Sequence, residues 1–494
     1  MPVKQCSKIW LLGLLGGCAL VMASVPTFAS TQSTQVDPAA TKKSTTTQNP
    51  ASTMTFKLKN GLQVIVEKDA RAPIVVSQIW YRIGSSFELT GTTGVSHVLE
   101  HMMFKETEIF KTGQVSKLVA KYGGSENAFT GQDYTGYYQL WEKSRLPISL
   151  AIEAERMQNL KLDPKEFAKE VKVVMEERRL RTDDQPLGTA YERFNAAAYV
   201  SSPYQAPIIG WMHDLERLTL KKTKQWYKQW YMPNNATLVV VGDVEFAEVK
   251  ALAEKYFGPI ESKVLPQLPD YHEVPPKGIK RIVVENNVKV PTLFMGWLVP
   301  SMKTATNPAE PYALNLLTQV LDGGLSARFE TELVRRKKLA SSIGTNYSAV
   351  SRGDTQFFIQ ATPADGVSLD TLEQAILDII DDVKQDVPSA KEMERIIAQL
   401  SAAEIFAKDS VSAKAQSIGR LAVVGIDWRK AYEGVEAYDE ITPEEVQKVA
   451  QKYLKPKRLT VLNLVPFTRT TSTHTTSKDT KPTADDHEST GAEQ

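Results

Sequence analysis

Apolar and polar positions along this chain follow an order that occurs twice. Alternating residues that open at Asp133 predict a strand, and a helical period over 146–157 predicts the helix that follows it. Alternating residues that open at Asp354, with a helical period over 368–383, repeat that order at similar spacing. This repeat indicates that the chain contains two copies of one domain.

A second pair of elements also occurs twice. Residues 218–241 predict a helix, a proline break and a buried strand, and residues 441–464 predict the same three features. Strands of hairpin type are predicted over 55–67 and 74–83. We therefore expect an α+β fold of two duplicated α/β sandwich domains, each with a mixed or antiparallel sheet covered by helices on one face.

The composition of the chain marks the limits of these domains. Residues 30–54 and 467–494 hold few large apolar side chains, which predicts a disordered linker and a disordered tail. The prolines of residues 261–280 indicate a linker between the two domains. The predicted N-terminal and C-terminal domains are residues 55–260 and 281–466.

The first 29 residues have the layout of a secretory signal peptide. A basic start is followed by an apolar run and by small residues that end at Ala29, where we expect cleavage. The protein is therefore expected to be periplasmic or secreted. Leu15-Gly16-Gly17-Cys18 resembles a lipoprotein cleavage box, so a membrane tether through a lipidated Cys18 remains the alternative.

Charge and cysteine content narrow the possible chemistry. A formal net charge of +1 offers no broad basic surface, so a nucleic-acid partner is not expected. Cys6 and Cys18 are the only cysteines, and both lie in the predicted signal peptide. The mature chain would have neither a disulfide nor a thiolate ligand, so a metal site must use histidine and carboxylate side chains.

Three titratable side chains share one face of a short predicted helix. His97, Glu100 and His101 stand at i, i+3 and i+4 in the pattern H-x-x-E-H. Two neutral imidazoles at this spacing can bind one Zn²⁺, and the carboxylate between them can accept a proton from water. Taken alone, the pentapeptide fits a solvated helix face equally well.

A catalytic zinc ion needs a third protein ligand, which here must be His, Asp or Glu. A helix predicted over 165–181 offers two carboxylates and two valines that would share a partly buried face: Glu170, Val173, Val174 and Glu177. Glu176 lies on another face and is expected to meet solvent or an arginine such as Arg179. A plain charged surface helix is the alternative interpretation.

Together these motifs resemble the pitrilysin or insulinase family of zinc peptidases, most of all its short bacterial and mitochondrial-processing-peptidase branch. The likeness rests on H-x-x-E-H, on the 75 residues between His101 and Glu177, and on Glu170 seven residues before Glu177. It extends from about residue 55 to 466, with matching flanks at residues 94–96, 103–105 and 123–130.

The resemblance implies a role for each residue of the motif. His97, His101 and Glu177 would bind one Zn²⁺ per chain, and Glu100 would be the general base. Glu170 would be a second carboxylate that orients a ligating histidine. The family fold would be a clam-shell half-chamber of two domains, of which only the first carries the metal.

The resemblance also implies where a substrate would lie. Asn127, Ala128 and Thr130 match an edge strand that holds the substrate backbone, although a plain buried hairpin strand is the alternative. Arg335 matches an arginine that binds substrate from the second domain. Ser341 stands where the family usually has a tyrosine, which predicts a weaker grip on the substrate.

The sequence thus predicts a zinc-dependent endopeptidase that acts on extended or unfolded polypeptides. We expect a homodimer, or a heterodimer with a paralogue that lacks the zinc motif and supplies the missing contacts. A non-catalytic scaffold or assembly subunit of the same fold is the main alternative, and a metal-sensing or metal-storing protein is a third. A scaffold would not require a carboxylate base, Glu100, next to the three metal ligands His97, His101 and Glu177, so the presence of all four residues speaks against this alternative.

Overall fold

A computed structural model of the chain describes residues 52–267 and 273–467. The predicted signal peptide, its cleavage site, the alternative lipid attachment at Cys18 and the C-terminal tail lie outside the described residues. Strand β1 begins at Thr53, two residues before the predicted start of the N-terminal domain. Within the described ranges, no helix is both long enough and apolar enough to cross a membrane.

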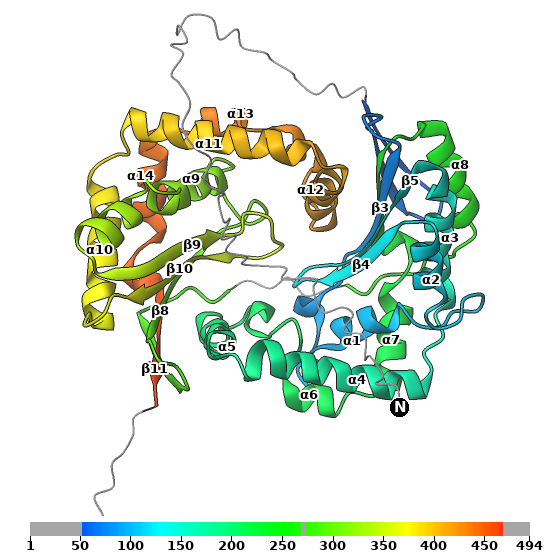
Figure 1. The fold of residues 1–494 in the computed structure, drawn as a ribbon, viewed down its shortest axis with the longest axis horizontal. Helices are drawn as coiled ribbons and strands as arrows, with labels where there is room; N and C mark the ends of the chain where they lie inside the picture. The colour runs from blue at the N-terminus through cyan, green and yellow to red at the C-terminus, as the bar shows by residue number, and fades with distance from the viewer. Residues whose placement is uncertain (1–51, 268–272, 468–494) are drawn as a thin grey trace, which may run out of the picture.

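The first half of the chain forms a six-stranded sheet in the order β1-β2-β6-β3-β5-β4 (Figure 1). Its strands are β1 Thr53–Lys57, β2 Gln63–Lys68, β3 Ile74–Tyr81, β4 Ser125–Thr130, β5 Thr135–Glu142 and β6 Ala236–Gly242. β2 and β6 are parallel and the other neighbours are antiparallel. β4 therefore stands at one edge of the sheet with β5 as its partner.

The second half forms a five-stranded sheet in the order β7-β11-β8-β10-β9. Its strands are β7 Lys280–Asn286, β8 Thr292–Val299, β9 Ala340–Tyr347, β10 Thr355–Pro363 and β11 Leu459–Pro466. This order repeats the order β2-β6-β3-β5-β4 of the first sheet. The parallel pair β7 and β11 corresponds to the parallel pair β2 and β6. The α+β fold of two duplicated domains is thereby confirmed.

The strands of hairpin type predicted over 55–67 and 74–83 correspond to β1, β2 and β3, and β2 and β3 are not neighbours in the sheet. Residues 55–67 span most of a hairpin of their own, β1 with β2. β6 lies between β2 and β3, because its apolar side chains are buried on both faces and need a central position.

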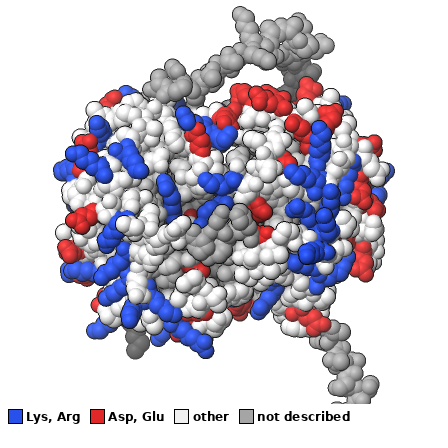
Figure 2. All heavy atoms as spheres, turned by 180° about the vertical axis from the view of Figure 1, so that it is seen from behind, with Lys and Arg blue, Asp and Glu red and all other residues white. Residues whose placement is uncertain are grey.

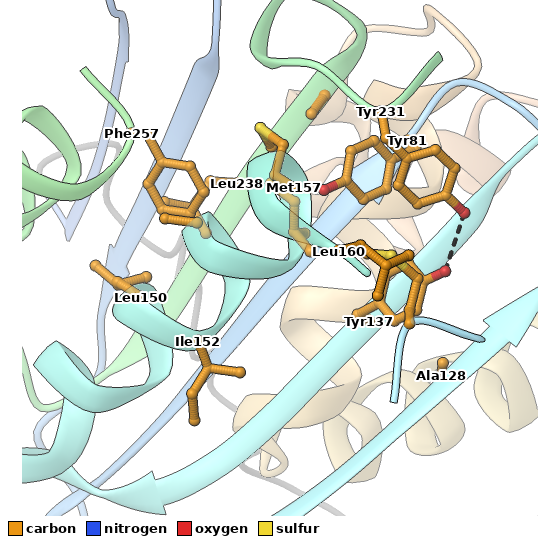
Figure 3. Packing of buried hydrophobic residues seen from close by; sticks show 14 of the residues in the cluster. Tyr81, Ala128, Tyr137, Leu150, Ile152, Met157, Leu160, Tyr231, Leu238 and Phe257 are labelled. Atoms are coloured by element: carbon orange, nitrogen blue, oxygen red, sulfur yellow. Dashed lines mark hydrogen bonds between the residues drawn. The ribbon is translucent and has the colours of Figure 1, made fainter. Parts of the chain in front are cut away.

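Helices cover the outer face of the first sheet. They are α1 Val95–Met102, α2 Gln114–Lys121, α3 Leu146–Asn159, α7 Leu220–Trp230 and α8 Phe246–Tyr256. α4 (Pro164–Arg178) packs on α1, and α6 (Met212–Glu216) packs on α4. Figure 3 shows part of the core beneath them, where the hydroxyls of Tyr137 and Tyr231 form a 2.9 Å hydrogen bond and Tyr81 stacks on Tyr231. Complete burial stabilises each large apolar side chain here by about 1.5–3 kcal/mol.

The second sheet has its own helical layer. Its helices are α9 Glu310–Asp322, α10 Leu369–Gln385, α11 Ala390–Lys408, α13 Glu436–Asp439 and α14 Pro443–Tyr453. The hydroxyls of Ser368, Ser389 and Thr442 accept hydrogen bonds from backbone N–H groups and so cap α10, α11 and α14. These caps define where each helix begins.

The two halves also exchange one helix each (Figure 1). α12 (Val411–Val423), from the second half, packs on β3 and β6 and shares a buried cluster with Trp80 and Val239. α5 (Pro186–Ala198), from the first half, packs on the second sheet, where Phe194 contacts Phe294. Each sheet is therefore covered on its second face by a helix of the other half, which the sequence did not predict.

Charged side chains are distributed over both halves. Figure 2 shows that on the face turned away in Figure 1, Lys and Arg lie in separate groups with Asp and Glu between them. This distribution agrees with the formal net charge of +1.

Candidate metal centre

Helix α1 is held at a fixed position by its N-terminus and its buried face. Gly94 precedes it with φ 87°, and a Cβ there would come within 2.6 Å of the Ile209 carbonyl oxygen, so glycine is required. Glu88 accepts hydrogen bonds of 2.7 Å from the N–H groups of Gly94 and Ser96. The opposite face of α1 is buried in the core, so the polar positions of the motif face α4.

The structure brings His97, His101 and Glu177 together. Their ligand atoms lie within 4.8 Å of one another, and the three side chains are 12%, 21% and 17% exposed. Glu177 Oε2 is 3.4 Å from His101 Nε2 and 3.7 Å from His97 Nε2. Ligands held about 2.0–2.2 Å from a tetrahedral zinc ion stand about 3.3–3.6 Å apart. The donor set and its spacing therefore fit Zn²⁺.

Glu170 fixes the orientation of one imidazole. Its Oε2 lies 3.1 Å from His101 Nδ1, and its Oε1 lies 2.6 Å from Lys105 Nζ. A proton on Nδ1 is then shared with Glu170, which leaves Nε2 free to ligate a metal. Burial opposes the charged form of His101, but the carboxylates of Glu170 and Glu177 outweigh it and raise the pKa of this histidine to about 9. Metal binding must therefore displace a proton there.

His97 is in a different environment from His101. Its Nδ1 is buried and has no hydrogen-bond partner among the described residues. Burial, followed by repulsion from His101, lowers the pKa of His97 to about 4. This imidazole is neutral at physiological pH, which is the form that ligates metal.

Glu177 divides its two oxygens between different partners. Oε1 pairs with Arg181 at 2.5 Å, and Oε2 points to the two histidines. Arg181 lies in a π-helical turn, η4 (Arg179–Asp183), that continues α4 and is a feature often found at functional sites. Burial raises the pKa of Glu177, but contacts with His101 and His97 outweigh it and hold the pKa below its usual value.

The buried face of α4 is narrower than the sequence predicted. Val174 is completely buried, whereas Val173 is 47% exposed, because α4 contacts α1 along one stripe and solvent along the next. The Glu176 side chain is 64% exposed and pairs with Arg179, away from the metal cluster. The geometry therefore favours Glu177 over Glu176 as the third ligand.

Glu100 lies beside the cluster and is held by the edge strand. The Thr130 hydroxyl donates a short hydrogen bond to Glu100 Oε2. Burial raises the pKa of Glu100 to about 7, although the hydrogen bond from Thr130 opposes this rise. A carboxyl group with a pKa near the working pH is suited to general acid and base chemistry.

The proposed substrate strand β4 carries Thr130, and its edge away from β5 has no partner among the described strands. Ala128 is buried in the core, and Asn127 Oδ1 accepts a hydrogen bond from the Ala128 N–H at 2.8 Å. The predicted contacts of Asn127 and Ala128 with a substrate stay predictions. The Thr130 side chain contacts Glu100, and its predicted role in holding a substrate backbone stays a prediction.

Arg335 and Ser341, the two positions singled out in the second half, form their contacts within the second half. Arg335 is in a π-helical segment, η7 (Glu330–Arg336), where its Nε pairs with Glu330 at 3.0 Å. Ser341 is on β9, and its hydroxyl donates to the Thr362 carbonyl at 3.3 Å. Neither contact tests the predicted substrate role of Arg335.

Two residues of the site were missed by the sequence analysis. Lys105 pairs with Glu170, and Arg181 pairs with Glu177. Arg181 could have been found by spacing, because it lies four residues after Glu177. Lys105 could not, because it follows the end of α1 at Met102 and reaches Glu170 on another helix. Each cation balances a carboxylate of the site.

Comparison with known proteins gives the same assignment for both halves. Residues 63–212 match the family described as Insulinase (Peptidase family M16), and residues 217–400 match the Peptidase M16 inactive domain. The zinc protease PqqE of Helicobacter pylori is 31% identical over 83% of this chain and 92% of its own length. A probable mitochondrial-processing peptidase subunit beta of Schizosaccharomyces pombe is 26% identical over 83% of this chain and 90% of its own length.

A solved structure agrees with the fold. The crystal structure of a protease from Helicobacter pylori superimposes with a TM-score of 0.79 at 31% identity, and the match covers 84% of this chain and 99% of that one. The segment matched to the insulinase family contains the metal cluster, and the segment matched to the inactive domain contains strands β7 to β10 of the second sheet. The chain therefore belongs to peptidase family M16.

Proposed function

We propose that this protein is a zinc-dependent endopeptidase that hydrolyses peptide bonds of extended or unfolded polypeptides. The observation that carries the proposal is a carboxyl group with a pKa raised to about 7, Glu100, beside three side chains with the spacing of zinc ligands. The zinc protease names of its relatives support a peptidase role. The signal-peptide layout supports export to the periplasm or beyond.

The residues of the site divide the work of hydrolysis between them. Zinc bound by His97, His101 and Glu177 would supply a Lewis acid that acidifies water and polarises the scissile carbonyl. Glu100 takes the proton of the attacking water on its free carboxylate oxygen and then delivers it to the leaving amine. The Thr130 hydroxyl keeps the other carboxylate oxygen in place during both transfers.

Strand β4 supplies the binding surface for the substrate. Among the described strands its backbone pairs with β5 alone, so an extended peptide can add to the sheet on the other side. Main-chain hydrogen bonds give affinity without strong side-chain selection. The proposed substrates are therefore unfolded segments rather than one sequence motif.

The second half contributes no metal centre within the residues that the structure describes. Its role in our proposal is to complete the substrate surface, with Arg335 as the candidate contact. Because Ser341 replaces the usual tyrosine of the resembled family, we propose that a second subunit supplies the remaining contacts, either a copy of this chain or a paralogue without the zinc motif.

The variant Glu100→Gln tests the proposal. It should abolish hydrolysis of a quenched, unfolded polypeptide while zinc content, measured by atomic absorption, stays at one ion per chain. Glu176→Gln is the matched control, because Glu176 is exposed on α4 and should leave both readouts unchanged. Full activity of Glu100→Gln would show that Glu100 is not the base, and an inactive zinc-loaded wild type would favour the scaffold alternative.

A further inference from the structure

A loop of the second half contacts the first half at the turn that follows strand β4. It connects β9 to β10 and carries Arg352 and Gly353. The Arg352 N–H donates to Asp133 Oδ2 at 2.9 Å, and its guanidinium Nε lies 3.6 Å from Asp133 Oδ1. The Gly353 N–H donates to the Tyr204 hydroxyl at 2.9 Å. These bonds join residues that are more than 140 positions apart in sequence.

Asp133 is the centre of this contact and is only 5% exposed. Its carboxylate also accepts hydrogen bonds from the Ser86 hydroxyl at 2.9 Å and from the Tyr204 hydroxyl at 2.5 Å. A buried carboxylate depends on such donors, since each one lost leaves charge without compensation. Arg352 is the cation that faces Asp133 in the described structure.

The Arg352 side chain also covers the short helix η2 (Ser85–Phe87). Its guanidinium carbon lies 3.9 Å from the centre of the Phe87 ring, and its NH2 group donates to the Ser86 hydroxyl at 3.2 Å. A planar guanidinium over an aromatic face adds a cation–π attraction that lysine reproduces poorly. One arginine therefore contacts two separate segments of the first half.

Each of these two segments is next in sequence to a residue that holds Glu100 or the helix that carries it. Asp133 is in the turn that follows Thr130, the residue whose hydroxyl holds Glu100. η2 is followed by Glu88, which caps the N-terminus of the helix that carries Glu100. The two segments are also tied to each other, because the Ser86 N–H donates to the Gln132 carbonyl at 2.8 Å.

We propose that Arg352 is a positioning residue through which the metal-free half sets the geometry of Glu100. Docking of the β9–β10 loop orders the turn behind Thr130 and the segment that caps α1, so the Thr130–Glu100 pair is aligned only when the second half is in place. This inference rests on the proposed peptidase function. It gives the second half a role in the proton-transfer step that is separate from substrate contact.

The test compares Arg352→Ala with Arg71→Ala. Arg71 also links the two halves, through an ion pair with Asp409 at 2.9 Å, but it contacts neither η2 nor the turn after Thr130. Loss of a charged hydrogen-bonded contact should lower kcat of Arg352→Ala about tenfold or more. KM and zinc content should stay within about twofold of wild type, and Arg71→Ala should keep the wild-type kcat.

Arg352→Lys provides a second variant if the alanine variant folds poorly. It keeps the positive charge and the backbone N–H, so it should fold and show an intermediate kcat with normal zinc content. Unchanged kcat in both Arg352 variants would overturn the inference while leaving the peptidase proposal intact. A loss of kcat that simply follows zinc loss or a lower thermal midpoint would also overturn it. A zinc-loaded wild type without hydrolysis would overturn both proposals.

Discussion

Replacing Thr130 with valine tests how the site holds its general base. The change keeps the shape of the side chain but removes the hydroxyl that donates to Glu100 Oε2. Burial already raises the pKa of Glu100 to about 7, and the Thr130 hydroxyl opposes that rise. Without the hydroxyl the carboxylate is less stable, so the pKa of Glu100 must increase.

The size of this effect follows from the hydrogen bond. A bond to a charged group contributes about 1.5–3 kcal/mol, and about 1.4 kcal/mol corresponds to one unit of pKa. Because Glu100 must be ionised to accept a proton, activity falls as the pH drops through its pKa. The acid limb of the kcat profile should therefore move up by about one pH unit or more in Thr130→Val. Bound zinc lowers the pKa of Glu100 in both proteins, so the difference between them is the informative quantity.

The assay is the pH dependence of kcat for a quenched, unfolded polypeptide, with zinc content measured on the same samples. At a pH above the acid limbs of both proteins, kcat of Thr130→Val should still be about tenfold lower than that of wild type, because Glu100 is no longer oriented by the hydroxyl. Thr362→Val, which changes a threonine on strand β10 of the second half, is the control and should match wild type. An unshifted acid limb with unchanged kcat would refute the role of Thr130.

Three further predictions test other parts of the account. Glu177→Ala should remove zinc from the purified protein, whereas Glu176→Ala should retain it, as measured by atomic absorption; retention in both would exclude Glu177 as a ligand. Glu170→Gln should weaken zinc affinity about 10- to 100-fold in a competition titration with a chelator, because His101 loses its charged partner; unchanged affinity would contradict this. Gly419→Ala should lower the free energy of unfolding by about 1–3 kcal/mol, because a Cβ at Gly419 would come within 2.1 Å of Trp80 Nε1. Denaturant unfolding measures this change, and wild-type stability of the variant would show that α12 shifts without cost.

Local patterns carried most of what could be predicted about the fold. The repeated strand and helix around Asp133 and Asp354 predicted the duplicated domains, because periodicity reports which face of an element is buried. It does not report which surface buries that face. The exchange of α5 and α12 between the halves was therefore not predictable, and neither was the insertion of β6 between β2 and β3.

The candidate site was predictable where its residues follow a regular spacing. His97, Glu100 and His101 lie on one helical turn, and Glu170 and Glu177 lie on one face of α4, so both groups could be found in the sequence. Arg352 could not, because it reaches Asp133 only through the packing of the two halves. Val173 was misplaced because a helical face has no sharp limit in sequence.

The central claim is that zinc at His97, His101 and Glu177 stands beside a peptide bound along β4. A crystal structure of the zinc-loaded Glu100→Gln variant with an extended peptide, using anomalous scattering at the zinc edge, tests it most directly. We predict one strong peak about 2.0–2.2 Å from one nitrogen of each histidine and from a Glu177 oxygen, with an uncleaved peptide paired to β4. An anomalous peak elsewhere, or a peptide bound away from β4, would contradict the account.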